Sequence, residues 1–300
     1  MENFGEKSPQ ESFESSKMQG EAYVSMIKSL AGENETSESP VSPELEPYKE
    51  AADHFFSKQK ERFEQGEFSA RKLLLQAFPA EKIPPEVEDE TKCSVEETSP
   101  GVFILNIDDE LYRKIRPSAR ALAVKIKGGV SFVVVPRYGK EALDQREREE
   151  NVPHEIHHLA WQGVKEADLA HSTEENIEMQ KAFTMFQDEL LARLSSDGTL
   201  SGYSHITMLS PTAKGEFERT YPAIYKMVMD TTVRMNEFLE DVNRELSSRG
   251  IPQDTLIGSV VGATSFESLW ENITKIRSHI GTLPLAPARN KSKGQSWDFL

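Results

Sequence analysis

The stretch Val152-Pro153-His154-Glu155-Ile156-His157-His158-Leu159-Ala160-Trp161 holds two histidines four positions apart, with a glutamate directly after the first. On a helix, residues four apart lie on one face, so His154 and His158 can direct their imidazoles at one metal ion. Glu155 projects beside that position, where it can take a proton from a water molecule. Zinc suits such a site because it accepts imidazole ligands and leaves a coordination position open. The stretch therefore predicts a zinc-binding helix, and a surface helix with clustered histidines and no metal is the alternative.

Pro153 bears on where this helix begins. A proline has no N–H to donate, and it disfavours helical backbone at the preceding residue. We therefore expect the helix to start near Pro153, with Asn151 or Val152 as its cap, or to kink there. A start at this point places the first histidine and the glutamate in the first turn. The positive helix end would then favour the carboxylate and disfavour imidazolium.

A catalytic zinc commonly takes a third protein ligand, and several candidates follow the motif. The run 173–194 predicts one helix, capped by its first residue or by the serine before it, because its apolar residues repeat at helical spacing. Glu178 and Glu189 share a face of this helix but lie about 16 Å apart, so only one can reach the ion. We prefer Glu189, because a carboxylate among apolar residues is costly unless it is paired. Asp168 and His171 are candidate ligands from the preceding loop.

Upstream of the motif the pattern changes to that of strands. Residues 101–107 are a short apolar run, and 120–127 carries apolar residues at alternate positions. Gly128-Gly129 is a turn signal before the apolar run 130–135, which predicts a β-hairpin. Together these segments predict a small, mostly antiparallel sheet.

Helical patterns dominate the remainder. A long helix is expected over 212–248, where Pro222 is a candidate kink, and a last helix over 264–280. The predicted fold class is therefore α+β, with a small mostly antiparallel sheet followed by the motif helix and a largely helical C-terminal half.

Charge and cysteine content restrict the partners. The formal net charge is −15, which argues against nucleic acid or an anionic membrane as the main partner. Cys93 is the only cysteine, so no disulfide can form within the chain, as expected in a reducing compartment. The sequence shows no secretory signal and no membrane span. We expect a cytoplasmic protein, and secretion without a signal peptide stays open.

The hairpin, the His-Glu-x-x-His helix and the later Glu189-Leu190-Leu191-Ala192 resemble a zincin metallopeptidase of the gluzincin type, over about residues 101–205. The resemblance implies that His154, His158 and Glu189 bind zinc. It also implies that Glu155 activates water and that the substrate is a peptide or protein. Two features depart from the pattern. A proline directly precedes the motif, and the spacing to the third ligand is longer than in thermolysin-like proteins, which favours Glu178.

Other residues near the motif have predicted roles. Tyr203 or His205 can donate a hydrogen bond to the oxyanion of a tetrahedral intermediate, and an inert loop is an equal alternative. His157 is expected behind the metal ligands or on the surface.

Composition and the resemblance together suggest a domain plan. Residues 1–46, rich in Glu, Ser and Pro, predict a disordered acidic tail, with a transient helix near 18–30. The other predicted segments are a helical pair at 47–84, a linker at 85–99, a zincin-like catalytic domain at 100–283 and a mobile tail at 284–300.

The sequence thus predicts a zinc-dependent hydrolase, most simply of peptide bonds. A second hypothesis is a binding or regulatory protein that keeps a zincin fold without turnover. A third is a carboxylate-bridged di-iron bundle, since Glu155-Ile156-His157-His158 also spells Glu-x-x-His. That site needs a second such motif, and Asp168-Leu169-Ala170-His171 is the nearest match.

Overall fold

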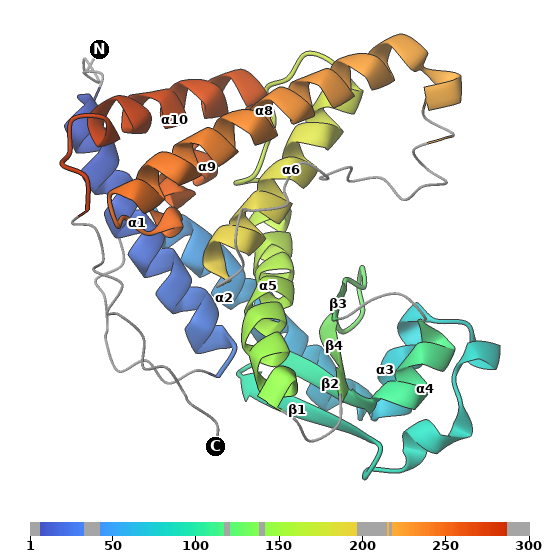
Figure 1. The fold of residues 1–300 in the computed structure, drawn as a ribbon. Coiled ribbons are helices and arrows are strands. Elements are labelled where there is room, and N and C mark those ends of the chain that lie inside the picture. Colours follow the sequence, from blue (N-terminus) through green and yellow to red (C-terminus); the bar gives the residue numbers. More distant parts are fainter. Residues whose placement is uncertain are drawn as a thin grey trace, which may run out of the picture.

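The protein is described by a computed structural model. The structure describes residues 7–32, 43–116, 121–137, 142–196, 215 and 218–286. The fold class is α+β, as predicted: a small mixed sheet lies at one end and helices make up most of the remainder (Figure 1). None of the helices in these ranges is long and apolar enough to cross a membrane.

The sheet has four strands in the order β1-β2-β4-β3. They are β1 (Cys93–Ser99), β2 (Val102–Asp108), β3 (Leu122–Val124) and β4 (Phe132–Arg137). The β1–β2 and β3–β4 pairs are antiparallel and the β2–β4 pair is parallel, so the predictions of a hairpin and of a mostly antiparallel sheet are confirmed. The prediction of a linker at 85–99 is wrong for Cys93–Ser99, which form β1. As an edge strand β1 is only partly buried, so it lacks the apolar run that identifies β2.

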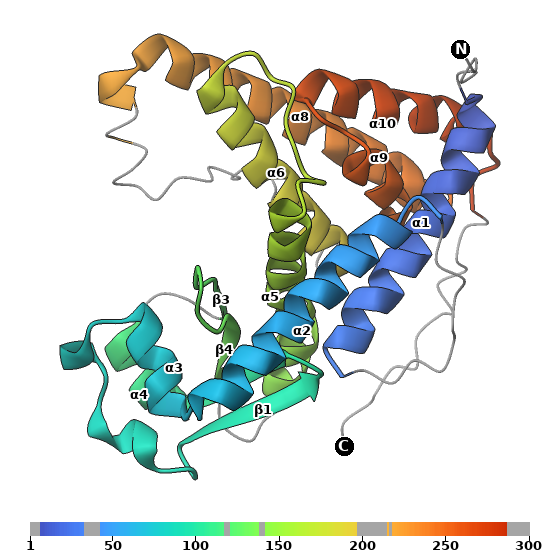
Figure 2. The same cartoon turned by 180° about the vertical axis from the view of Figure 1, so that it is seen from behind.

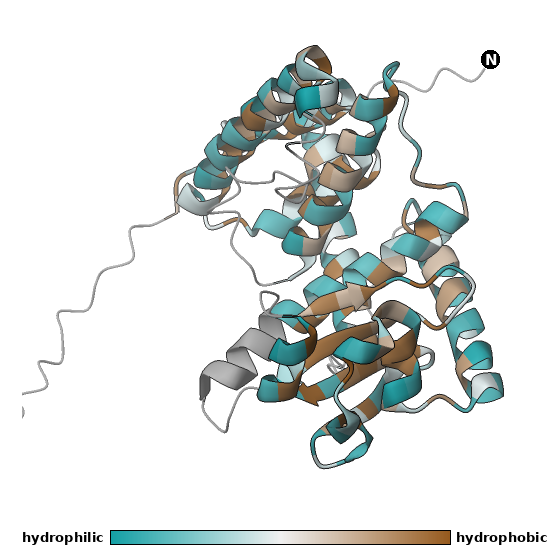
Figure 3. Ribbon diagram, turned by 90° about the vertical axis from the view of Figure 1, so that its right-hand side faces the viewer, coloured by the Kyte–Doolittle hydropathy of each residue, from teal (hydrophilic) through white to brown (hydrophobic). Residues whose placement is uncertain are grey.

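Both faces of the sheet are covered. Ile104 of β2 and Val133 of β4 face the main core, which α1, α2, α5 and the C-terminal helices complete. Phe103 and Leu105 face a second core with α3 (Ala70–Ala77) and α4 (Asp109–Ile115). Figure 3 shows the strands as a layer of hydrophobic residues. This double burial explains why the central strands are continuous apolar runs.

The motif helix α5 runs from Ala142 to Glu166 and passes through Pro153. The prediction of a start near Pro153 is therefore wrong, and the motif lies within the helix rather than in its first turn. Val152 and Ile156, on either side of the proline, are buried in the main core. Their burial offsets a proline penalty of about 3 kcal/mol. A helix-end dipole therefore does not act on the motif residues.

The N-terminal segment departs most from its prediction. Residues 9–30, expected within a disordered tail, form helix α1 (Pro9–Leu30), which starts with a capping box between Ser8 and Glu11. Its Tyr23 and Ile27 are buried in the main core. The composition of this segment suggested disorder because it holds few apolar residues. Those few lie on one face, and they stabilise the helix because the rest of the chain supplies an apolar surface for them to cover.

Two of the remaining helices pack on α5, and the C-terminal helices pack on α1 and α6. Helix α2 (Glu46–Gly66) packs across α5, as Figure 2 shows from behind, and α2 with α3 occupies the region predicted as a helical pair. Helix α6 (Ile177–Ser195) also packs on α5, and it begins after Asn176, whose side chain caps it, rather than at 172 or 173. Helix α8 (Pro222–Ser248) begins at its proline, so the single helix expected over 212–248 is wrong: residues 218–220 are helical, but the backbone leaves the helix at Tyr221 and a new helix starts at Pro222. Helices α9 (Ile257–Val261) and α10 (Phe266–Ile280) complete the helical half.

Candidate metal centre

Helices α5 and α6 bring three predicted ligands together. His154 and His158 of α5 lie with their ring centroids 4.9 Å apart. Glu189 Oε2 of α6 lies 3.8 Å from His154 Nε2 and 3.6 Å from His158 Nε2. All three donor atoms are within 4.8 Å of one another. The two histidines of α5 and the glutamate of α6 therefore converge on a single point.

This donor set fits a zinc ion. Zinc–nitrogen and zinc–oxygen bonds of about 2.0–2.1 Å in a tetrahedron separate ligand atoms by about 3.4 Å. The 3.6 and 3.8 Å separations from Glu189 are close to that value. Two imidazoles and one carboxylate also match the usual composition of a catalytic zinc site, in which a fourth position stays open.

Asp188 orients one of the two histidines. Its Oδ1 lies 2.7 Å from Nδ1 of His158, so Nδ1 carries the hydrogen of this bond. The Nε2 atom is thereby left to face Glu189. A carboxylate behind a ligating imidazole is a common arrangement, because it fixes the ring and raises the basicity of the ligand nitrogen.

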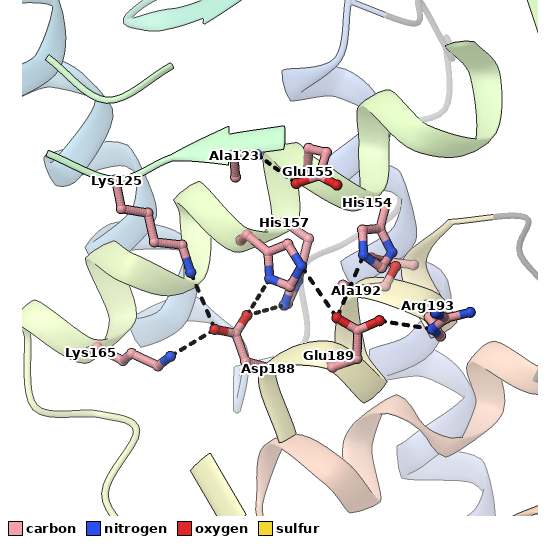
Figure 4. A network of polar contacts seen from close by, with 12 residues as sticks. Ala123, Lys125, His154, Glu155, His157, Lys165, Asp188, Glu189, Ala192 and Arg193 are labelled. Atoms are coloured by element: carbon pink, nitrogen blue, oxygen red, sulfur yellow. Dashed lines mark hydrogen bonds and ion pairs between the residues drawn. The ribbon is translucent and has the colours of Figure 1, made fainter. Parts of the chain in front are cut away.

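Two lysines hold Asp188 from the opposite side. Lys165 Nζ lies 2.7 Å and Lys125 Nζ 3.4 Å from Asp188 Oδ2, as Figure 4 shows. His157, His158 and Asp188 form a second group of possible metal donors. The ammonium groups already neutralise the carboxylate there and would repel a cation. We therefore interpret this second group as residues that orient the ligands of the first group and do not bind metal themselves.

Glu155 is held beside the centre by the sheet. Its Oε2 accepts a 2.6 Å hydrogen bond from the backbone N–H of Ala123, in edge strand β3. Burial raises the pKa of Glu155, although His158 and the Ala123 N–H oppose the rise. A raised pKa makes a carboxylate a better proton acceptor.

The charges at the three ligands are strongly coupled. Burial, together with the nearby His158, lowers the pKa of His154 to about 3, so this imidazole is neutral. Burial also disfavours a charge on His158, but its hydrogen bonds to Asp188 and Glu189 outweigh burial and raise its pKa to about 9. Burial would raise the pKa of Glu189, yet the two histidines overcome it and hold the pKa at about 2. Without metal, an imidazolium–carboxylate pair thus occupies the centre.

The other candidate ligands and the candidate oxyanion donors lie apart from this cluster or outside the described residues. Glu178 pairs with Lys181 at 2.8 Å, at the beginning of α6. Asp168 and His171 belong to neither group of clustered metal donors found among the described residues. Tyr203 and His205 lie outside the described residues.

His157 and Asp188 have larger roles in the site than the sequence predicted. His157 is fully buried, which excludes the surface position considered for it, and its Nδ1 lies 3.0 Å from the hydroxyl of Tyr23. The role of Asp188 was missed. The available signal was its position directly before Glu189 in an otherwise apolar part of α6. No sequence pattern indicated that Tyr23 and Lys125 belong to the site, because they come from distant parts of the chain.

No protein-family model matches the chain, and neither does any curated protein or solved structure. The interpretation of the centre therefore rests on its own geometry.

Proposed function

We propose that this chain is a zinc-dependent hydrolase of the zincin type that cleaves peptide bonds. The observation that carries the proposal is the convergence of His154, His158 and Glu189 on one point, with the partly buried Glu155 next to the first histidine in sequence. In this proposal the two Nε2 atoms and a Glu189 carboxylate oxygen hold the metal. When bound, zinc supplies a Lewis acid that polarises a carbonyl and makes water more acidic.

Glu155 supplies the proton transfers. Its carboxylate accepts a proton from the attacking water, whose oxygen forms the new bond to the carbonyl carbon. The carboxylic acid then gives that proton to the amine nitrogen as the carbon–nitrogen bond breaks. The Ala123 N–H engages Oε2 and holds the side chain in one orientation. The raised pKa of Glu155 supports both transfers, because the group can take and release a proton within the same pH range.

The position of β3 supports a peptide as the substrate. Among the described residues β3 pairs only with β4, so none of the described strands lies along its other edge. An extended peptide can pair with such an edge through backbone hydrogen bonds. Ala123 of this strand contacts Glu155, so a peptide laid along β3 would bring its backbone close to the proton-transfer group.

Metal content and turnover test the proposal together. Elemental mass spectrometry of the purified protein should find about one zinc per chain, and His158→Ala should lose it. His171→Ala, which changes a histidine outside the cluster, is the matched control and should keep the metal. The zinc-loaded protein should then cleave members of a peptide library, and Glu155→Gln should not. Absence of zinc from the wild type after zinc is supplied would refute the proposal.

A further inference from the structure

We infer that Tyr23 of the N-terminal helix and His157 of α5 are positioning residues for the metal centre: they hold Asp188, and through it the imidazole of His158. This inference rests on the proposed function for its consequence, zinc binding. Its basis is a buried chain of polar side chains that runs from α1 through α5 to α6.

The first link joins α1 to α5. The Tyr23 hydroxyl and His157 Nδ1 are 3.0 Å apart, and both side chains are essentially excluded from solvent. Buried polar groups that lack a partner are costly, so these two satisfy each other. Trp161 stacks on the His157 ring at a centroid distance of 5.9 Å and keeps the ring in its plane.

The second link joins α5 to α6. His157 Nε2 makes no hydrogen bond among the described residues, but it lies 3.4 Å from Asp188 Oδ1, which is close enough for an electrostatic contact. Asp188 Oδ2 lies 2.7 Å from the Lys165 ammonium, so the carboxylate is paired with a cation, and an ionised carboxylate only accepts hydrogen bonds. A hydrogen on Nε2 of His157 therefore faces an acceptor, whereas a bare nitrogen there would face another negative group.

This assignment sets the direction of the whole chain. With the hydrogen on Nε2, Nδ1 of His157 is an acceptor, so Tyr23 donates to it. Tyr23 donates to His157, His157 points its Nε2–H at Asp188, and Asp188 Oδ1 also accepts from His158 Nδ1 at 2.7 Å. Asp188 Oδ1 is thus hydrogen-bonded to His158 and in electrostatic contact with His157, while Oδ2 is held by Lys125 and Lys165.

The consequence is that α1 forms part of the metal centre although it supplies no ligand. Removing the Tyr23 hydroxyl takes away the hydrogen that Nδ1 of His157 accepts, so the imidazole can change its tautomer. Asp188 Oδ1 then loses one of the two groups that fix it, and the His158 ring loses its orientation. Partners of ligating histidines are typically worth about 10–100-fold in metal affinity. Tyr23 acts two links further away, through His157 and Asp188, so we expect a loss at the lower end of this range, about tenfold.

Tyr23→Phe tests the inference with little disturbance of packing, because it removes one oxygen. Tyr48→Phe is the matched control: Tyr48 stacks on the same Trp161 at 6.1 Å, but its hydroxyl faces the Val261 carbonyl at 3.5 Å. Zinc affinity is measured by competition with a chelator. The ring ¹⁵N resonances of His157 and His158 are recorded by NMR in the zinc-free proteins, so that one readout does not depend on metal.

We expect Tyr23→Phe to lower zinc affinity about tenfold and to shift the ring resonances of both histidines, while Tyr48→Phe changes neither. If the wild type binds zinc and the two variants have equal affinities, the inference is overturned. If the wild type binds no zinc, the proposed function fails, and the resonances decide the inference separately. A shift of the His158 ring in Tyr23→Phe alone then supports the positioning chain, and an unchanged His158 ring refutes it.

Discussion

Asp188 Oδ1 lies 2.7 Å from Nδ1 of His158, on the far side of the imidazole from Glu189. This contact determines which ring nitrogen faces the candidate ligands. The aspartate and the glutamate are neighbours in sequence, so a single turn of α6 supplies both the group that orients the histidine and the group that would share its metal.

Asp188→Asn should lower zinc affinity by about 10–100-fold without removing the site. The amide keeps the shape and one acceptor oxygen, but it loses the charge that polarises His158. Chelator competition measures the change. Glu245→Gln, which alters a carboxylate paired with Arg277 at 2.9 Å in the helical half, is the control and should have no effect. Equal affinities for wild type and Asp188→Asn would contradict an orienting role.

Glu189→Gln should lower zinc affinity by about a hundredfold or more, because it replaces a charged ligand by a neutral amide. Glu178→Gln is the control on the same helix, where Glu178 pairs with Lys181 near the N-terminus. Both variants are titrated with zinc against the same chelator. Similar losses in the two variants, or none, would remove Glu189 from the ligand set.

Glu155→Gln should keep zinc and lower peptide hydrolysis by about 10²–10⁴-fold. The glutamine oxygen can still accept the Ala123 N–H, so the helix and strand keep their contact, but the side chain can no longer carry the proton. Metal content and turnover are measured on the same sample. Retained turnover would exclude Glu155 as the base, and loss of zinc together with turnover would indicate a structural role.

Zinc affinity should rise by about tenfold per pH unit from about pH 6.5 towards pH 9. An imidazole must lose its proton to bind a metal, and His158, whose pKa is raised to about 9, holds one throughout this range. His154 and Glu189, with pKa values of about 3 and 2, are already deprotonated and add nothing to the slope. Competition titrations at several pH values measure it. A slope near zero, or near two protons, would contradict this charge assignment.

Gly163→Ala should destabilise the fold by about 1–3 kcal/mol. A Cβ at this position of α5 would lie 2.6 Å from Phe55 Cβ and 2.8 Å from the Ala51 carbonyl oxygen, both in α2. Urea unfolding followed by circular dichroism measures the change in the free energy of unfolding. Gly262→Ala, whose Cβ would meet only the Gly258 carbonyl oxygen at 3.5 Å, is the control. Equal unfolding midpoints would show that α2 can move away from α5 at no cost.

The sequence alone determined the features that depend on local spacing. The four-residue separation of His154 and His158 places both on one helix face, and the apolar neighbours of Glu189 favour it over Glu178 as the third ligand. The hairpin was predictable because Gly128-Gly129 separates two strand-like runs. These patterns involve residues close in sequence, whose relation is set by backbone geometry.

Only the tertiary structure decided the course of α5, the stability of α1 and the support of His158. These features depend on contacts between residues that are distant in sequence. Burial of Val152 and Ile156 carries α5 through Pro153, and a core supplied by later helices makes α1 a stable helix. The support of His158 joins Tyr23, Lys125 and Asp188, which come from three separate parts of the chain. No local pattern links such residues. They meet because packing α1, β3 and α6 around α5 is the arrangement that buries their apolar neighbours, and the polar groups drawn in with them must then satisfy one another.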